Sequence, residues 1–150
     1  MMAALVQTQL ISFNTLALRF QDDAYTLAYY LLGDDALAAR ATQAAFARVF
    51  SILSRHTRVS EELFRLEVLR WVLKNCRPGG QKQLRSAADD ELINRLMALP
   101  IDDRSVVVLV DVLNLSYRVA ALAVGCSEKE LAKRLGRARL NLSRAAARQA

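Results

Sequence analysis

The sequence contains few of the residues on which tight turns, disulfide frameworks and metal sites depend. Its 150 residues include five glycines, two prolines, two cysteines and one histidine. The low glycine and proline content argues against a turn-rich β architecture, and Cys76 and Cys126 are too few for a disulfide framework. The single histidine, His56, excludes a histidine-rich metal site and lies in a polar interval where a solvated side chain is expected. We therefore expect no metal, no cofactor, no catalytic residues and no small-molecule substrate, and we find no case for an enzyme.

Long hydrophobic runs and a secretion signal are also missing. The most apolar stretch, residues 105–112, is interrupted by Asp111 and is much shorter than a membrane span. The first seven residues lack the basic start and the long apolar core of a signal peptide. Together with the two unpaired cysteines, these features predict a cytoplasmic protein without a membrane partner.

Apolar residues at helical spacing are what the sequence has in abundance. They predict a series of helices, and residues such as Gly33, Ser60 and Ser116 mark several of the helix ends. The predicted helices cover approximately residues 13–32, 36–53, 61–76, 89–98, 102–113, 116–124 and 128–148. Val106-Val107-Val108 favours a strand by propensity alone, but it lies within a helical pattern, so we predict helix there. The predicted fold class is all-α.

The helical pattern is interrupted once, at Arg77-Pro78-Gly79-Gly80, where three residues that break helices fall together. We interpret residues 77–88 as a linker between two small helical domains. Residues 1–76 then form a three-helix bundle, and residues 89–150 form a second domain that contains a helix-turn-helix.

The excess of positive charge is concentrated at the C-terminus. The chain carries 21 basic and 15 acidic residues, which gives a net charge of +6. From residue 128 onward, two acidic residues stand against the cations Lys129, Lys133, Arg134, Arg137, Arg139, Arg144 and Arg148. A localised basic element predicts an anionic partner, whereas a uniform excess would chiefly favour solubility.

Residues 115–135 predict the helix-turn-helix. Ser116 can cap a short helix that ends at Gly125, and Ser127 with Glu130 forms the S-x-x-E capping box of the last helix. A projection at about 100° per residue places the apolar and the cationic side chains of the last helix on separate faces. The predicted DNA contacts come from its first turns, from Lys129, Glu130, Lys133, Arg134 and Arg137. The alternative is an ordinary solvated basic face of an amphipathic helix.

Four short motifs occur here in the order and at the spacing of a known family. They are Leu99-Pro100 with Arg104, Leu115-Ser116-Tyr117, Gly125-Cys126-Ser127, and Arg134-Leu135-Gly136-Arg137-Ala138-Arg139. Each motif is weak, but the ordered set resembles region 4 of the extracytoplasmic-function sigma factors, which belong to the sigma-70 family. The N-terminal part resembles region 2 of the same family more faintly, through Gly33-Asp34, Ala38, Gln43, Phe46 and Val72–Asn75.

The resemblance implies a diverged alternative sigma factor, which is a bacterial transcription initiation protein. Region 4 of such a protein reads promoter DNA through the helix that begins near Ser127, which places Lys133 and Arg134 on the DNA side. Region 2 binds core RNA polymerase and opens the promoter, which places Gln43 and Phe46 in the polymerase-binding part. Promoter DNA, core RNA polymerase and an anti-sigma factor are the partners that the resemblance implies.

The N-terminal part departs from the pattern of the family. Ala39 and Arg40 replace an acidic pair, and Ala44 replaces a further acid. Because the contact with polymerase depends partly on acidic groups, a second hypothesis stays open. In it, the chain is a degenerate sigma-like protein-interaction module that does not bind polymerase. A third and weaker hypothesis is a helix-turn-helix regulator that acts without polymerase.

Overall fold

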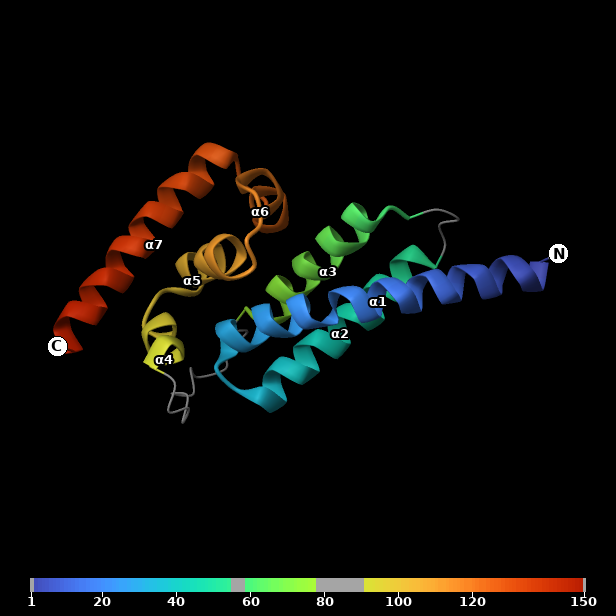
Figure 1. Cartoon of the computed structure of the whole chain (residues 1–150), viewed down its shortest axis with the longest axis horizontal. Helices are drawn as coiled ribbons and strands as arrows, with labels where there is room; N and C mark the ends of the chain where they lie inside the picture. The colour runs from blue at the N-terminus through green and yellow to red at the C-terminus, as the bar shows by residue number, and fades with distance from the viewer. Residues whose placement is uncertain (1, 55–58, 78–90, 150) are drawn as a thin grey trace.

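The computed structural model describes residues 2–54, 59–77 and 91–149, and all regular structure in these ranges is helical (Figure 1). The predicted all-α fold is thereby confirmed. The elements are α1 (Met2–Leu32), α2 (Asp35–Leu53), α3 (Glu61–Asn75), α4 (Glu91–Met97), α5 (Ile101–Val107), the π-helix η1 (Val108–Val112), α6 (Tyr117–Val124) and α7 (Glu128–Gln149). We refer to residues 2–77 as the N-terminal half and to residues 91–149 as the C-terminal half. The predicted linker, apart from Arg77, lies outside the described residues, as does His56.

The N-terminal half is a three-helix bundle of α1, α2 and α3. α1 ends where Gly33 adopts a left-handed φ of 68°, and Asp34 caps α2 by accepting a hydrogen bond from the N–H of Leu37 (2.8 Å). Inside the bundle, the ring of Phe64 is 1% exposed and lies 5.3 Å from the ring of Phe13, centroid to centroid. The local capping signals and the apolar stripes therefore account for this half.

α1 begins at Met2, about three turns before the predicted start near Phe13. The first 18 residues contain no charged residue, glycine or proline, so nothing in them ends a helix. The prediction relied on the stripe that packs against the bundle, and that stripe includes Phe13. The additional turns carry α1 past the ends of α2 and α3 (Figure 1).

In the C-terminal half, the helix that contains the valine run changes its winding. Val106, Val107 and Val108 are helical and buried, as predicted from the pattern and against their strand propensity. From Val108 the helix continues as η1, and the N–H of Leu113 donates to the carbonyl of Val108 (2.9 Å), five residues earlier. Asn114 then turns the chain with a positive φ of 55°.

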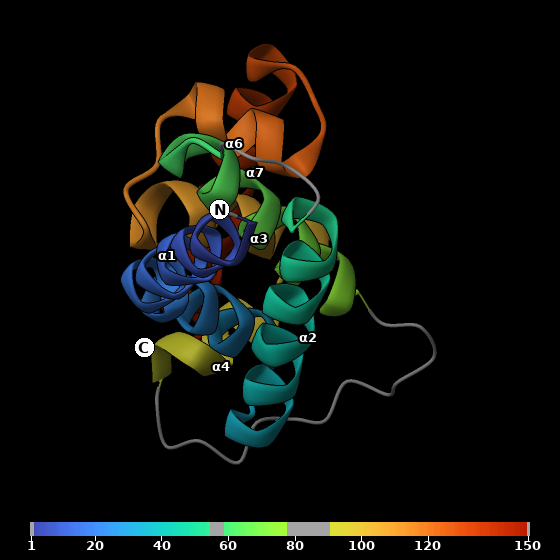
Figure 2. The same cartoon turned by 90° about the vertical axis from the view of Figure 1, so that its right-hand side faces the viewer.

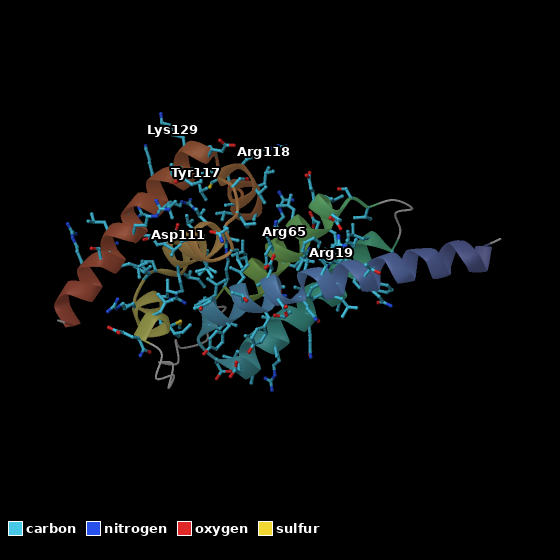
Figure 3. The ribbon with its side chains drawn as sticks, in the orientation of Figure 1. Arg19, Arg65, Asp111, Tyr117, Arg118 and Lys129 are labelled. Carbon is cyan, nitrogen blue, oxygen red and sulfur yellow. The ribbon has the colours of Figure 1, made fainter. Side chains whose placement is uncertain are left out.

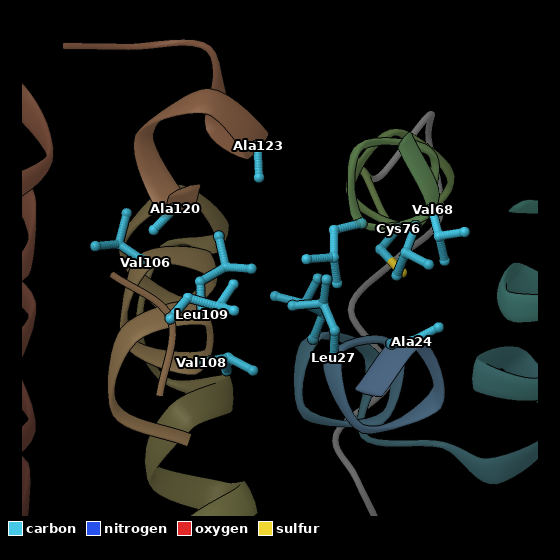
Figure 4. Packing of buried hydrophobic residues seen from close by; sticks show 14 of the residues in the cluster. Ala24, Leu27, Val68, Cys76, Val106, Val108, Leu109, Ala120 and Ala123 are labelled. Carbon is cyan, nitrogen blue, oxygen red and sulfur yellow. The ribbon is translucent and has the colours of Figure 1, made fainter. Parts of the chain in front are cut away.

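The two halves share one apolar core. α1 packs against α4, α5 and η1, while α3 packs against α6. Figure 4 shows Leu27 of α1 on one side of this junction and Val108 and Leu109 on the other, and each of the three is fully buried. α2 packs on α1 and α3. α6 lies at the top of the view in Figure 2. No helix in the described ranges is apolar over enough residues to cross a bilayer.

Candidate nucleic-acid interface

α6 and α7 form a capped helix-turn-helix. The hydroxyl of Ser116 accepts a hydrogen bond from the N–H of Val119 (3.2 Å) and so caps α6. Gly125 ends α6 with a φ of 85°, and Ser127 caps α7 by accepting from the N–H of Glu130 (3.1 Å). These are the residues that the sequence predicts for the two helix ends and the turn.

α7 separates a packed face from a cationic face. Leu131, Leu135 and Ala138 are buried against the rest of the C-terminal half. Lys129 and Lys133 are exposed, and Lys129 projects from the start of α7 into solvent (Figure 3). The side chains that can approach a polyanion therefore lie on the side of α7 that faces away from the core.

Glu130 makes two contacts at the start of α7, one through its backbone and one through its side chain. Its N–H donates to Ser127, as predicted, but its carboxylate accepts from Nε of Arg134 one turn later (3.4 Å). Glu130 is exposed and Arg134 is half-buried. The pair orders the first two turns of α7 without removing either side chain from the surface.

Two arginines of α7 are bound to carboxylates of α5 and η1. Nε and Nη2 of Arg137 donate to the two oxygens of Asp103 (3.3 and 2.7 Å), and Nε and Nη2 of Arg139 donate to the two oxygens of Asp111 (3.1 and 2.6 Å). These hydrogen bonds raise the pKa of both guanidinium groups above the usual value. The sequence placed Arg137 on the DNA face but gave no sign of its partner, because residues 34 positions apart are joined only by the tertiary fold.

The two residues predicted to bind polymerase do not share an environment. Gln43 is exposed on the outer side of α2. Phe46 is partly buried and lies 6.3 Å from the ring of Phe64 inside the bundle, centroid to centroid. Gln43 is therefore available to a partner, whereas Phe46 contributes chiefly to packing.

Trp71 is covered by cations. The guanidinium of Arg48 lies 5.0 Å and the ammonium of Lys74 lies 4.5 Å from the centroid of its ring. Trp71 and Lys74 also line a cavity of about 380 Å³ between α3, α5 and α6, into which Asp102 and Ser105 project from the C-terminal half.

No group of metal-ligating side chains occurs in the part of the chain that the structure describes. Cys76 is buried, and burial raises the pKa of its thiol to about 12, so this cysteine is a core residue and not a nucleophile.

Comparison with known proteins identifies the domain that contains this helix-turn-helix. Residues 89–142 match the family model described as sigma-70, region 4. These residues are therefore similar to sigma-70 region 4. This match agrees with the predicted resemblance of the C-terminal residues to sigma-70 region 4. α6 and the first part of α7 lie within the matched residues.

Two solved structures share the fold along most of the chain. CnrH, solved in complex with the cytosolic domain of CnrY, has 23% sequence identity and a TM-score of 0.75, and the match covers 99% of this chain and 96% of CnrH. The sigma factor RpoE, solved in complex with the anti-sigma factor NepR from Bartonella quintana, has 16% identity and a TM-score of 0.70. That match covers 89% of this chain and 95% of RpoE. No curated protein matches the chain in sequence.

Proposed function

We propose that this chain is an alternative sigma factor that binds promoter DNA through α7 in complex with core RNA polymerase. The observation that carries the proposal is the outward cationic face of α7, which is the second helix of a capped helix-turn-helix in the residues that match sigma-70 region 4. The chain acts by binding and by strand opening, without catalysis by its own residues, in the cytoplasm. In this proposal residues 1–76 have the role of region 2 and residues 89–150 that of region 4.

DNA reading is assigned to the first turns of α7. In a helix-turn-helix, the N-terminal residues of the second helix meet base edges in the major groove, and neighbouring cations bind phosphates. Lys129, Glu130 and Lys133 are exposed there, and Arg134 is held one turn from Glu130. Glu130 can accept a hydrogen bond from a cytosine amino group, while the three cations can donate to guanine or to phosphate.

The N-terminal half is the proposed polymerase-binding part, with Gln43 as its exposed contact residue. Phe46 supports this surface from within the bundle. An anti-sigma factor is a further proposed partner, because RpoE shares the fold and was solved with such a protein.

The test of DNA binding is the double substitution Lys133→Ala with Arg134→Ala. We expect weaker binding of a promoter fragment and a shallower dependence of the affinity on salt, by about one to two units in the log–log slope. The matched control is Arg19→Ala, since Arg19 is an exposed arginine of α1 that pairs with Glu61. If the double variant keeps the affinity and slope of the control, α7 does not contact DNA through these residues.

A second candidate function is a sigma-like protein-interaction module without polymerase binding. Arg40 and Ala44, which replace acids of the family, are both exposed on α2, so the charge of this surface is altered where a partner would touch it. Co-elution of the purified chain with core RNA polymerase in size-exclusion chromatography separates the two functions. Stable co-elution supports the sigma factor, whereas a folded chain that elutes alone supports the interaction module.

A further inference from the structure

We propose that Asp103 and Asp111 are positioning residues that fix the orientation of α7 for DNA, by holding Arg137 and Arg139 away from the DNA. The role rests on the proposed function, because it concerns the helix that reads DNA. It changes the expectation for Arg137, whose side chain is 61% exposed but whose guanidinium is held by Asp103.

Asp103 is the more deeply placed anchor. Its side chain is 4% exposed, and both of its oxygens accept hydrogen bonds from Arg137. A buried carboxylate that loses a charged donor pays a desolvation penalty, so Arg137 cannot leave Asp103 for a phosphate without that cost. A flexible surface arginine would be free to make such an exchange.

Asp111 is the second anchor, and it belongs to the π-helix. η1 spans Val108–Val112, so the change in winding occurs at the turn that carries Asp111. A π-helical turn places its side chains at a different angle from an α-helical turn, and such turns occur often at functional sites. Here Asp111 reaches Arg139 with both oxygens (3.1 and 2.6 Å).

The two ion pairs hold α7 from two sides. On a projection of about 100° per residue with Lys129 at zero, Arg137 lies near 80° and Arg139 near 280°. The buried stripe of Leu131 and Leu135 lies near 200–240°, and the free cations Lys133 and Arg144 lie near 40–60°. The two anchors therefore flank the outward face that carries the free cations. Anchors at both flanks resist rotation of the helix about its axis, which an apolar stripe alone resists less specifically.

Asp103→Asn separates positioning from charge. Removing a negative charge beside a DNA-binding helix strengthens binding if only charge matters, whereas loss of an anchor weakens binding. The probe is a fluorescein-labelled pool of random-sequence duplex DNA of about 30 base pairs, and its binding to the full chain is measured by anisotropy from about 50 to 200 mM salt. The matched control is Asp102→Asn, since Asp102 is the exposed neighbour of Asp103 on α5.

We expect Asp103→Asn to weaken binding about tenfold relative to Asp102→Asn, because a charged and bidentate pair is lost. Arg137→Gln should weaken binding similarly with an unchanged salt slope, and the double variant should be no weaker than either single variant. Lys133→Gln, by contrast, should reduce the slope by about one unit. Circular dichroism checks that each variant is helical, and Asp111→Asn, at a more exposed anchor, serves if Asp103→Asn does not fold.

The outcomes are distinct. If Asp103→Asn binds as tightly as Asp102→Asn, or if Arg137→Gln lowers the slope as Lys133→Gln does, the positioning role is refuted while DNA binding stands. If the unaltered chain fails to bind the duplex pool, the proposed function fails first, and the positioning role fails with it.

Discussion

At the scale of single residues, Arg104 is the most unusual side chain in the protein. It is 1% exposed, yet its guanidinium donates to backbone carbonyls, including those of Leu96 (2.8 Å) and Leu99 (2.9 Å), and to the carbonyl of Leu31 in α1. Leu31 and Leu96 belong to the last turns of α1 and α4, where unpaired carbonyls carry the negative end of the helix dipole. Burial lowers the pKa of Arg104, but an arginine stays charged at any ordinary pH. One buried cation thus satisfies the ends of two helices.

Arg104→Met is therefore predicted to be strongly destabilising. The methionine fills much of the volume but removes the charged donor that the carbonyls of Leu31, Leu96 and Leu99 share, so we expect a loss of about 3–5 kcal/mol in the free energy of unfolding. Urea unfolding followed by circular dichroism measures it. Arg65→Met is the matched control, because Arg65 is half-exposed and pairs with Asp23 (3.2 Å), and we expect a change of about 1 kcal/mol or less. Equal stability of the two variants would show that the carbonyls find other donors.

At the scale of elements, Gly125 and Gly136 serve opposite purposes in the helix-turn-helix. Gly125 ends α6 with a φ of +85°, whereas Gly136 is exposed within the regular part of α7. A Cβ at either position would meet nothing within 4 Å, so only the backbone conformation distinguishes the two glycines. An L side chain is strained at the first position and favoured at the second.

We predict opposite effects for alanine at these two positions. Gly125→Ala should cost about 1–2 kcal/mol because the left-handed conformation is strained. Gly136→Ala should stabilise the protein by about 0.5–1 kcal/mol because alanine restricts the unfolded chain and favours helix. Thermal unfolding of the two variants and of the parent chain measures whether each substitution lowers or raises the stability. A shift in the same direction for both variants would contradict the conformational explanation.

The elements also show which features a sequence can predict. Ser60, Ser116 and Ser127 were predicted as helix starts and cap their helices, since a cap depends on residues three positions away. Asp103 was predicted only as part of a helix, because its partner is 34 positions away and the spacing of neighbours does not reveal it.

The sequence also did not predict the true start of α1 or the π-helical winding of η1, because neither is visible in the spacing of apolar residues. The start of α1 was predicted too late, because an apolar stripe shows only which part of a helix is buried. A helix can extend beyond the surface that buries it. The π-helical turn at Val108 leaves the apolar pattern of its helix unbroken, so the period of the sequence does not distinguish it. Distant pairing and local winding are set by the tertiary fold.

At the scale of the whole molecule, two arginines join the halves in a reciprocal manner. Arg104 of the C-terminal half donates to the carbonyl of Leu31 at the end of α1. Arg70 of the N-terminal half donates from Nε to the carbonyl of Leu122 in the last turn of α6 (3.1 Å). Each half thus supplies a cation to the C-terminal end of a helix in the other half, where the helix dipole favours positive charge. These bonds add directional contacts to the shared apolar core.

Arg70→Ala is predicted to loosen the contact between the halves without unfolding either one. We expect the ratio of separated to docked molecules to rise about fivefold, the effect of one charge-assisted hydrogen bond at a partly exposed site. Spin labels are attached at two exposed positions, Ala47→Cys on α2 and Ala132→Cys on α7, and the distribution of distances between them is measured. Cys126 is replaced by serine in all variants, and Cys76 is buried. Arg65→Ala on the same helix is the control, since its partner Asp23 lies in its own half.

Arg70→Ala also tests whether DNA binding by α7 is independent of the surface that α3 presents between the halves. Lys129 and Lys133 of the cationic face are exposed on α7, whereas Trp71 and Lys74 of α3 line the cavity between the halves. Separation of the halves should therefore expose the surface of α3 and leave the affinity of α7 for duplex DNA within about twofold of the control. A longer distance distribution with unchanged duplex binding would show that docking controls access to the N-terminal half alone. An unchanged distribution in Arg70→Ala would mean that the apolar core holds the halves together without the arginine.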